Sequence, residues 1–468
     1  MKFISTRGKA PAIDFAELLL SGTAPDGGLY MPESLPDFSK NIPKWGSISY
    51  QELCFYLLQP FVEGHFSDFV LKDLIRKAYA PFSHPEICTI KPEQDYYLLE
   101  LFHGPTYAFK DYALQLLGHF FEKTLEAGDK KYIFLGSTSG DTGSAAIHAL
   151  KQKKNIFVVM LHPNRRVSEI QAKQMLTVFD PNVVNLAIQG TFDDCQALVK
   201  ALFALPGFSK EYSLGAVNSI NLVRILIQVA YYFYAYFAFQ KLNLPFVISV
   251  PSGNFGNAFS AYLASLMGLP VEEIVVASNQ NHVLTTFFDT GVYQPKEVVA
   301  SLSPSMDIQI SSNLERYLWL LANKDGEKIQ TLYSQLKNQN QFFFDPKLFS
   351  NSLVKFTAGF ASEKEVRQRI NAYYQTTKNY MDPHTAVGVE VAIKKGKKNF
   401  LSLATAHPVK FYDRLEQITF STYPLPQKIQ TLLDSPSRCL ILPADLMEVK
   451  ELIENLHKEG KADFWAEE

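Results

Sequence analysis

The sequence predicts an α/β protein in which a small N-terminal domain precedes two domains built on parallel β-sheets. Two segments carry the main signal, because residues 130–153 and residues 244–268 both run from an apolar strand through a glycine-containing loop into an alanine-rich helix. Continuous apolar strands followed by helices are typical of parallel sheets that are covered on both faces. Further apolar runs at residues 155–163, 272–280 and 399–408 predict additional buried strands of the same kind.

The expected domain boundaries follow changes in composition along the chain. Residues 1–95 are rich in turn signals, such as the Pro-Asp-Gly-Gly run that begins at Pro25, and form the predicted N-terminal domain. Residues 96–240 are expected to form the first α/β domain, and residues 241–468 the second. The polar stretch near residues 318–380 predicts a helical insertion in that second domain.

Several elements can be placed more closely. The first α/β domain has an expected strand at Tyr132–Leu135, and the second has one at Phe246–Val250, followed by a loop at Pro251–Asn257 and a helix that begins near Ala258. The apolar run Ile225–Phe239 is shorter than the roughly 20 residues that a membrane span requires. We therefore expect a buried helix there and no contact with a membrane.

Charge and cysteine content exclude several classes of partner. The 45 basic and 47 acidic side chains give a formal charge of −2, which offers no electrostatic footprint for nucleic acid or an acidic membrane surface. A small molecule is therefore the expected partner. The N-terminus lacks the apolar core of a signal peptide, and the four cysteines are too scattered for a disulfide framework, so we expect a cytoplasmic protein.

The loop Ser252–Asn257, with the sequence SGNFGN, is a candidate phosphate-binding loop. Its glycines lie between a predicted strand and a helix N-terminus, where backbone N–H groups and the helix dipole favour an anion. The loop matches neither the dinucleotide-binding pattern nor the P-loop, and it contains no cation. The alternative is a tight turn between strand and helix without a ligand.

The loop within Gly136–Ala146 has the same construction with more hydroxyl groups. The hydroxyls of Ser137, Thr138, Ser139 and Thr142, together with the loop amides, are suited to a carboxylate or a second phosphate. Asp141 does not belong in a simple anion site. Its carboxylate either caps the following helix or meets an amine or ring hydroxyl of a ligand.

Lys110 is a candidate nucleophile. A buried lysine has a lowered pKa and forms a Schiff base with an aldehyde, and the neighbouring Tyr107 and Phe109 provide apolar surroundings. The alternative is an ordinary lysine that pairs with Asp111 or with solvent. The three candidate sites together favour the nucleophile over the ordinary lysine. A Schiff-base lysine, a cation-free phosphate loop and a hydroxyl-rich anion loop are what pyridoxal phosphate and an amino-acid substrate require.

Eight motifs in a fixed order extend this interpretation from near residue 25 to near residue 411. They are PDGGLYMP (25–32), HGPTYAFKD (103–111), TSGDTGSAA (138–146), VNSINLVR (217–224), PSGNFGNA (251–258), SSNLERYL (311–318), DPHTAVG (382–388) and ATAHPVKF (404–411). With them the chain resembles the threonine synthases, which are pyridoxal-phosphate enzymes of the tryptophan-synthase-β fold type, also called fold type II. The resemblance implies two parallel-sheet domains of that type.

The resemblance also implies roles for the cofactor-binding residues. Lys110 holds pyridoxal phosphate as a Schiff base, and residues Gly253 to Asn257 hold its phosphate. Thr405 is similar to the hydroxyl partner of the pyridine nitrogen, and a neutral hydroxyl favours elimination chemistry over transamination. Asp141 is shared with threonine synthases, whereas many relatives of the wider fold type have asparagine there. The implied cofactor-binding residues are Lys110, Asp141, Gly253, Asn254, Phe255, Gly256, Asn257 and Thr405.

The implied reaction converts O-phospho-L-homoserine and water to L-threonine and phosphate by γ-elimination and β-addition of water, the last step of threonine biosynthesis. Lys110, released by the substrate amine, is the implied catalytic base. Arg224 is the leading candidate for the cation at the leaving phosphate, and Arg316 is the second. The implied substrate-binding residues are Ser137, Thr138, Ser139, Gly140, Thr142, Asn218, Ser219, Asn221, Arg224 and Arg316.

Two other functions are compatible with parts of this pattern. A threonine or serine dehydratase shares the lysine and the glycine loop but has no need for the arginine-bearing segments. A non-catalytic relative that binds phosphorylated amino acids is expected to have lost the lysine, which is present here. No zinc-binding spacing occurs, structural hydrogen bonds are expected for His103, His384 and His407, and the protein is expected to be a monomer or a homodimer.

Overall fold

The computed structural model describes residues 1–126, 128 and 130–459. Contacts group the chain into two compact units, which differ from the three contiguous domains that the sequence predicts. The expected N-terminal domain shares unit 1 with a large sheet, and the C-terminal segment belongs to unit 2. Unit 1 comprises Met1–Leu18, Thr23–Phe109 and Ser219–Tyr423, and unit 2 comprises Leu19–Gly22, Lys110–Asn218 and Pro424–Glu468.

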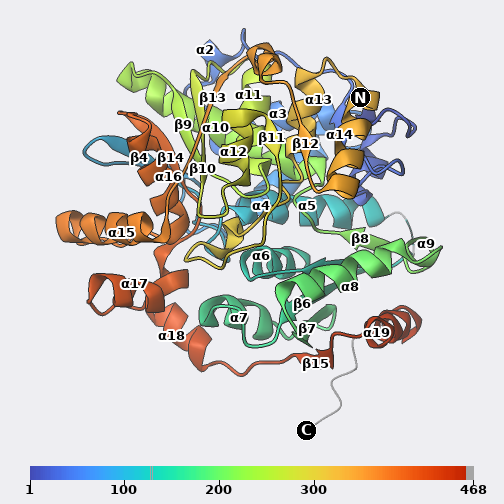
Figure 1. Ribbon diagram of the computed structural model, residues 1–468. Coiled ribbons are helices and arrows are strands. Elements are labelled where there is room, and N and C mark those ends of the chain that lie inside the picture. Colours follow the sequence, from blue (N-terminus) through green and yellow to red (C-terminus); the bar gives the residue numbers. More distant parts are fainter. Residues whose placement is uncertain (127, 129, 460–468) are drawn as a thin grey trace. The chain divides into compact units, whose positions relative to one another are not determined.

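Unit 1 is built on a six-stranded sheet with the order β13-β10-β9-β14-β4-β3 (Figure 1). All neighbouring strands are parallel except β3, which pairs with β4 in the antiparallel sense. The strands predicted within residues 244–268, 272–280 and 399–408 are confirmed as β9, β10 and β14. The bounds are β3 Thr89–Pro92, β4 Tyr96–Glu100, β9 Val247–Pro251, β10 Glu273–Ser278, β13 Lys355–Phe360 and β14 Phe400–Ala404.

The helix α10, Leu222–Leu242, is a core helix of unit 1 and confirms the prediction for Ile225–Phe239. Asn221 caps its N-terminus, and Asn243 ends it in the left-handed conformation with φ of 53°. By length and composition it is long enough to cross a membrane, but 83% of its most apolar window is buried in the protein. Its apolar character therefore reflects packing within unit 1, where it contacts α3 and α11.

The remaining elements of unit 1 surround this sheet and helix. A capping box, in which Ser49 and Glu52 bond to each other's backbone N–H groups, starts α3. The helices are α2 Ile42–Trp45, α3 Tyr50–Val62, α4 Asp68–Tyr79, α11 Gly256–Leu266, α12 Val283–Thr290, α13 Leu314–Leu321, α14 Gly326–Gln339, α15 Glu363–Thr377, α16 Pro383–Lys394 and α17 Tyr412–Thr419. Two small antiparallel pairs join β1 Phe3–Ser5 to β2 Tyr30–Pro32 and β11 Val292–Tyr293 to β12 Phe342–Phe343.

The insertion expected near residues 318–380 is not purely helical. It contains the second half of α13 together with α14 and α15, but it also contains β13, which pairs in parallel with β10. The strand β13 lies at the edge of the sheet and is only partly buried, so it lacks the continuous apolar run that marks the central strands. Its Lys355-to-Phe360 sequence, with an internal glycine, therefore gave no strand signal.

Unit 2 is built on a five-stranded parallel sheet with the order β15-β7-β6-β5-β8. The strands predicted at residues 132–135 and 155–163 are confirmed as β5 and β6. The strand bounds are β5 Tyr132–Ser137, β6 Ile156–Pro163, β7 Val183–Gln189, β8 Leu214–Ala216 and β15 Leu440–Pro443. The helices are α5 Lys110–Leu125, α6 Asp141–Leu150, α7 Glu169–Leu176, α8 Phe192–Ala204, α9 Phe208–Glu211, α18 Gln427–Asp434 and α19 Leu446–Glu459.

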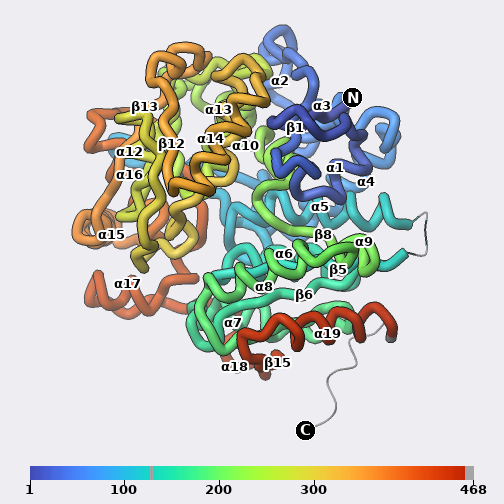
Figure 2. The backbone as a smooth tube through the Cα atoms, turned by 45° about the vertical axis from the view of Figure 1, so that its right-hand side comes forward, coloured from blue at the N-terminus to red at the C-terminus, as the bar shows by residue number. Residues whose placement is uncertain are grey.

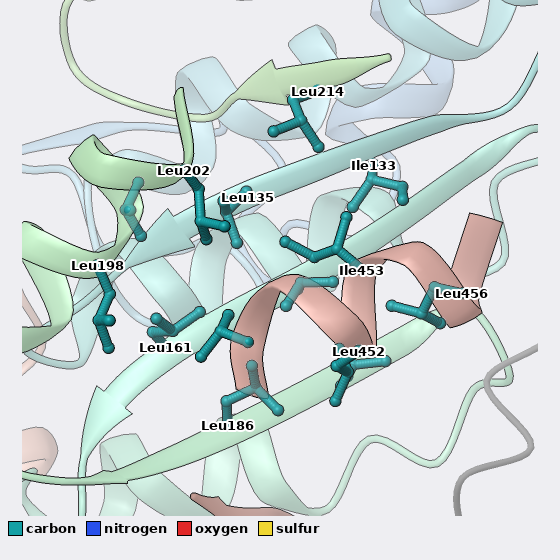
Figure 3. Packing of buried hydrophobic residues seen from close by; sticks show 14 of the residues in the cluster. Ile133, Leu135, Leu161, Leu186, Leu198, Leu202, Leu214, Leu452, Ile453 and Leu456 are labelled. Carbon is teal, nitrogen blue, oxygen red and sulfur yellow. The ribbon is translucent and has the colours of Figure 1, made fainter. Parts of the chain in front are cut away.

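The C-terminal segment completes unit 2 rather than the domain to which the sequence assigned it. The strand β15 extends the sheet beside β7, and α19 contacts α8 (Figure 2). Leu452, Ile453 and Leu456 of α19 belong to the apolar core that includes Ile133 and Leu186 of the sheet (Figure 3). The sheet that carries the Lys110 helix and the 137–142 loop is thus covered by residues more than two hundred positions downstream.

Candidate active site

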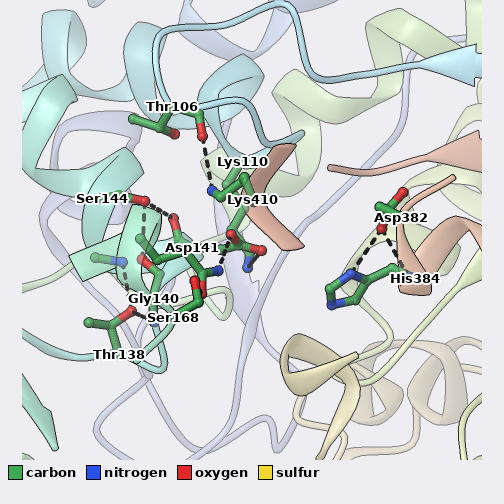
Figure 4. Close-up of polar contacts among 12 residues, drawn as sticks. Thr106, Lys110, Thr138, Gly140, Asp141, Ser144, Ser168, Asp382, His384 and Lys410 are labelled. Atoms are coloured by element: carbon green, nitrogen blue, oxygen red, sulfur yellow. Dashed lines mark hydrogen bonds and ion pairs between the residues drawn. The ribbon is translucent and has the colours of Figure 1, made fainter. Parts of the chain in front are cut away.

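Lys110 is buried and is the first residue of α5. Only 9% of its surface is exposed, and its Nζ lies 3.3 Å from Oδ2 of Asp141 (Figure 4). Burial excludes a lysine that pairs only with solvent, and the role of Lys110 as a nucleophile stays a prediction. A buried amine in contact with a carboxylate has the setting that a covalent attachment point requires.

Asp141 is held on both of its carboxylate oxygens. One oxygen faces Lys110, and the other accepts a hydrogen bond of 2.7 Å from Nε2 of Gln171. The Oε1 atom of Gln171 in turn accepts a hydrogen bond of 2.6 Å from the Ser168 hydroxyl. Gly140, not Asp141, is the N-cap of α6, so the carboxylate does not cap the helix. We call Lys110, Asp141, Gln171 and Ser168 the lysine cluster.

The hydroxyl groups of the 137–142 loop have different environments. The Thr138 hydroxyl is buried and accepts hydrogen bonds from the N–H groups of Gly140 and Gly143, at 2.9 and 2.8 Å. It therefore shapes the loop from within. Ser137, Ser139 and Thr142 are half-buried beside it and present the more accessible hydroxyls.

The substitution Gly140→Ala should distort the lysine cluster. Gly140 has a φ of 136°, and a Cβ there would lie 2.6 Å from the carboxamide carbon of Gln171. We expect the unfolding free energy to fall by roughly 1–3 kcal/mol from backbone strain, with a further loss as Gln171 moves away from Asp141. Chemical denaturation measures the change.

A matched control is Gly207→Ala, where φ is 76° but no atom lies within 4 Å of the added Cβ. This variant isolates the backbone strain. Equal losses for the two variants would contradict the role given to the Gly140–Gln171 contact.

The loop Ser252–Asn257 joins β9 to α11 in unit 1, as predicted. Phe255 is the N-cap of α11 in the left-handed conformation, with φ of 60°, and its side chain makes no cap hydrogen bond. The carbonyl oxygen of Gly253 accepts a hydrogen bond from the Ser311 hydroxyl, and that of Asn254 accepts one of 3.1 Å from the N–H of Asn313. The loop carbonyls are thus occupied, and the helix N-terminus remains uncapped by side chains.

The residues of this loop fit a phosphate group. A Cβ on Gly253 would lie 3.0 Å from Ile308, and one on Gly256 would lie 3.2 Å from Asn313, so the loop has little room for side chains. Asn257 is 6% exposed, and within the described part of the chain its Nδ2 has no hydrogen-bond partner. A buried donor beside an uncapped helix N-terminus is suited to an anionic oxygen.

Thr405 and Ser252 directly follow β14 and β9, which are adjacent parallel strands. Ser402 is paired with Ser249, three residues before Thr405 and Ser252, respectively. The carbonyl oxygen of Thr405 also accepts a hydrogen bond of 2.9 Å from the N–H of Phe109, which precedes Lys110 in the chain. Ligands of open α/β sheets bind at the carboxyl ends of the strands where the strand order reverses, and β9 and β14 meet at such a point.

Arg224 lies in the first turn of α10 and is buried. Burial lowers the pKa of its guanidinium to about 10, so it remains charged at neutral pH. Asn221 uses its Oδ1 to cap α10 through the N–H of Val223, whereas Asn218 is exposed and Ser219 is half-buried. Arg224 is therefore a buried cation and not the helix-surface residue of the alternative interpretation, and its contact with the leaving phosphate stays a prediction.

Arg316 has contacts that do not support its predicted contact with substrate. It is 0% exposed, and its guanidinium donates to the carbonyl oxygens of Tyr30 and Ile220, at 3.1 and 2.6 Å, and to Oδ1 of Asn313. Burial lowers its pKa to about 9. These contacts tie three segments of unit 1 together, so Arg316 positions backbone instead of presenting a cation.

Asn313 connects the Arg224 segment to the phosphate loop. Its Nδ2 donates to the carbonyl oxygens of Ser219 and Asn254, at 3.3 and 3.1 Å. The segment that begins α10 and the loop that begins α11 are therefore held side by side within unit 1. Asn313 belongs to the SSNLERYL motif, from which the sequence indicates Arg316 as a candidate site residue and not Asn313.

The three histidines in the matched motifs all hydrogen-bond to other protein groups, as expected for structural residues. The partners are Glu100 for His103, Asp382 for His384 and the N–H of Val409 for His407. Burial lowers the pKa of His407 to about 4. Because the folded protein then binds fewer protons than the unfolded chain between pH 6.5 and 4, stability should fall as the pH falls through that window.

The substitution His407→Asn tests this pH dependence, since asparagine can still accept the hydrogen bond from Val409. The native protein should lose roughly 2–4 kcal/mol more stability than the variant between pH 7 and pH 4. Denaturation curves at the two pH values measure the difference. Parallel losses in both proteins would show that His407 is not the responsible group.

Comparison with protein families assigns this chain to a known class of enzyme. Residues 90–402 match the family described as pyridoxal-phosphate dependent enzyme, residues 2–79 match the threonine synthase N terminus, and residues 385–453 match the threonine synthase C-terminal family. The first match covers more than half of the chain. The chain is therefore a pyridoxal-phosphate-dependent enzyme, in agreement with the lysine cluster and the phosphate loop.

Relatives over the full length define the family more narrowly. The threonine synthase of Pseudomonas aeruginosa is 40% identical over 98% of this chain and 100% of its own length. The crystal structure of pyridoxal-phosphate-bound threonine synthase from Brucella melitensis has a TM-score of 0.93 at 38% identity and covers 98% of this chain and 99% of that one. The yeast enzyme gives a TM-score of 0.90 at 38% identity over 98% and 99% of the two chains. This chain belongs to the threonine synthase family.

Proposed function

We propose that this enzyme converts O-phospho-L-homoserine and water to L-threonine and inorganic phosphate. The observation that carries the proposal is the match to threonine synthases along nearly the whole of both chains. The contact of the buried Lys110 with Asp141 supports it. The dehydratase alternative lacks such support, because the threonine synthase N- and C-terminal families match outside the shared cofactor-binding region. A cytoplasmic monomer or homodimer is the form in which we expect it to act.

Three groups are proposed to hold the cofactor. Lys110 binds it covalently, the Ser252–Asn257 loop binds its phosphate, and the Thr405 hydroxyl pairs with its ring nitrogen. When bound, pyridoxal phosphate withdraws electrons from the α-carbon of an amino-acid substrate. Asp141 holds the Lys110 amine in place through the 3.3 Å contact, and Gln171 fixes the carboxylate orientation.

Lys110 is also the proposed proton carrier. Once the substrate amine has displaced it, its Nζ takes the α-proton and moves protons at the β- and γ-carbons. The phosphate leaves from the γ-carbon and water adds its hydroxyl at the β-carbon, so the atoms of substrate and water are all recovered in threonine and phosphate. Asp141 stabilises the protonated amine between these transfers.

The substrate itself is held by two proposed sets of groups. The 137–142 loop, through its amides and the hydroxyls of Ser137, Ser139 and Thr142, binds the α-carboxylate at the start of α6. Arg224 stabilises the negative charge on the leaving phosphate. The second set also includes Asn218, Ser219 and Asn221, which are proposed to form hydrogen bonds with the leaving phosphate beside Arg224.

Product analysis tests the proposal against its rivals. Purified enzyme supplied with O-phospho-L-homoserine should release threonine and phosphate in equal amounts. With L-threonine as substrate it should form little 2-oxobutanoate and ammonia, which are the products of a dehydratase. Absence of turnover with a fully bound cofactor would favour the non-catalytic relative and reject the proposal.

A further inference from the structure

Two consecutive tyrosines of α10 converge on one side chain of α11. The hydroxyl oxygens of Tyr231 and Tyr232 both lie 2.5 Å from Oδ1 of Asn257, and the Tyr232 hydroxyl is also 2.8 Å from the Asn257 carbonyl oxygen. Adjacent residues on a helix point in different directions, so both can reach one atom only if it lies between them. The close packing of α10 and α11 provides that arrangement.

The hydrogen bonds of both tyrosine hydroxyls run to Oδ1 of Asn257, so the oxygen end of the carboxamide faces the tyrosines. Both hydroxyl groups are buried, with 0% of either residue exposed, and burial raises their pKa well above 10. They therefore stay protonated and act as donors to the carboxamide oxygen.

This orientation leaves the NH₂ group of Asn257 as the free end. Within the described residues its Nδ2 has no hydrogen-bond partner, although the residue is 6% exposed. Asn257 is the second residue of α11, in the turn whose backbone N–H groups no side chain caps. A donor left unpaired in this place is satisfied when an anionic oxygen binds at the helix N-terminus.

We infer that Tyr231 and Tyr232 are positioning residues for cofactor binding, which orient Asn257 so that its NH₂ group donates to the phosphate of pyridoxal phosphate. The inference rests on the proposal that the Ser252–Asn257 loop receives this phosphate. The tyrosines themselves do not touch the cofactor. Their effect passes through one carboxamide, which in the opposite orientation would direct an oxygen at the anion and repel it.

Cofactor affinity measured with two ligands tests the inference without depending on catalysis. Apo-enzyme is titrated with pyridoxal phosphate and with pyridoxal, which has the same aldehyde and ring but no phosphate. The double variant Tyr231→Phe/Tyr232→Phe should bind pyridoxal phosphate about tenfold more weakly, the size of one lost hydrogen bond to a charged group, with no change for pyridoxal. Each single variant should also bind pyridoxal phosphate more weakly without a change for pyridoxal. The single variants replace the double variant in this test if the double variant does not fold.

Two further variants show whether the tyrosines act through Asn257 or through a general effect on the structure. In Asn257→Ala the tyrosine substitutions should have no further effect, because the side chain through which they act is missing. Tyr79→Phe removes another buried hydroxyl of unit 1, which lies near Cys54 at 3.9 Å, and should leave both affinities unchanged.

Each contrary outcome has a distinct meaning. Equal weakening of both ligands, or a tyrosine effect that persists in Asn257→Ala, would overturn the positioning role and indicate a general structural effect. If Asn257→Ala itself left the ratio of the two affinities unchanged, its NH₂ group would not contact the phosphate and the inference would be overturned, while the backbone N–H groups of the loop could still hold the phosphate. If the unaltered enzyme bound pyridoxal phosphate no more tightly than pyridoxal, the proposal that the loop receives the phosphate would fail first.

Discussion

The variant Lys110→Ala should lose turnover with O-phospho-L-homoserine by a factor of roughly 10³ or more, because it removes both the covalent attachment and the proton carrier. The phosphate loop is intact in this variant, so cofactor should still bind without a covalent bond. Steady-state assays measure the first effect. Absorption spectra before and after dialysis measure the second, since cofactor that is not covalently held dissociates.

A matched control for this result is Lys153→Ala. Lys153 is a half-buried lysine of the same unit that forms an ion pair of 2.8 Å with Glu122. Its loss should change stability slightly and leave turnover in place. If Lys110→Ala retained turnover near the native level, the assignment of Lys110 as both attachment point and base would be wrong.

The variant Arg224→Ala should lower kcat/KM for O-phospho-L-homoserine by roughly 10²–10³, the usual effect of removing one stabilising group at a developing charge. The physical reason is that the substitution replaces a buried guanidinium, charged at neutral pH, by a methyl group at the proposed position of the leaving phosphate. Both KM and the rate of phosphate release should change, and both are measured in the same assay.

Arg369→Ala is a suitable control, because Arg369 forms an ion pair of 2.8 Å with Glu390 on neighbouring helices of unit 1. This variant should leave kcat/KM unchanged. Arg316→Ala should mainly reduce stability, since its guanidinium holds backbone carbonyls of Tyr30 and Ile220. An unchanged kcat/KM in Arg224→Ala would remove Arg224 from the site.

The central strands and the loop Ser252–Asn257 between a strand and a helix could be predicted from the sequence because each is a local signal. The strands β5, β6, β9, β10 and β14 are buried on both faces and appear as continuous apolar runs. The edge strand β13 has no such run. The grouping of the C-terminal segment with unit 2 depends on pairing between β15 and β7, which no local pattern encodes.

The contacts within the lysine cluster could not be predicted from local sequence patterns either. Lys110 and Asp141 lie in recognisable motifs, but their contact depends on how α5 and α6 begin relative to each other. Gln171 was missed, because its segment carries no chemical signature and its importance lies in a hydrogen bond to a residue 30 positions away. Tyr231 and Tyr232 were hidden within an apolar run that correctly predicted a buried helix.

The central claim, that phosphate leaves by elimination and water supplies the hydroxyl of threonine, is tested most directly in water labelled with oxygen-18. The enzyme is supplied with O-phospho-L-homoserine, and both products are examined by mass spectrometry. Elimination breaks the bond between carbon and oxygen, so the label should appear in the hydroxyl group of threonine and not in the phosphate. Labelled phosphate accompanied by homoserine would show attack at phosphorus and would contradict the account.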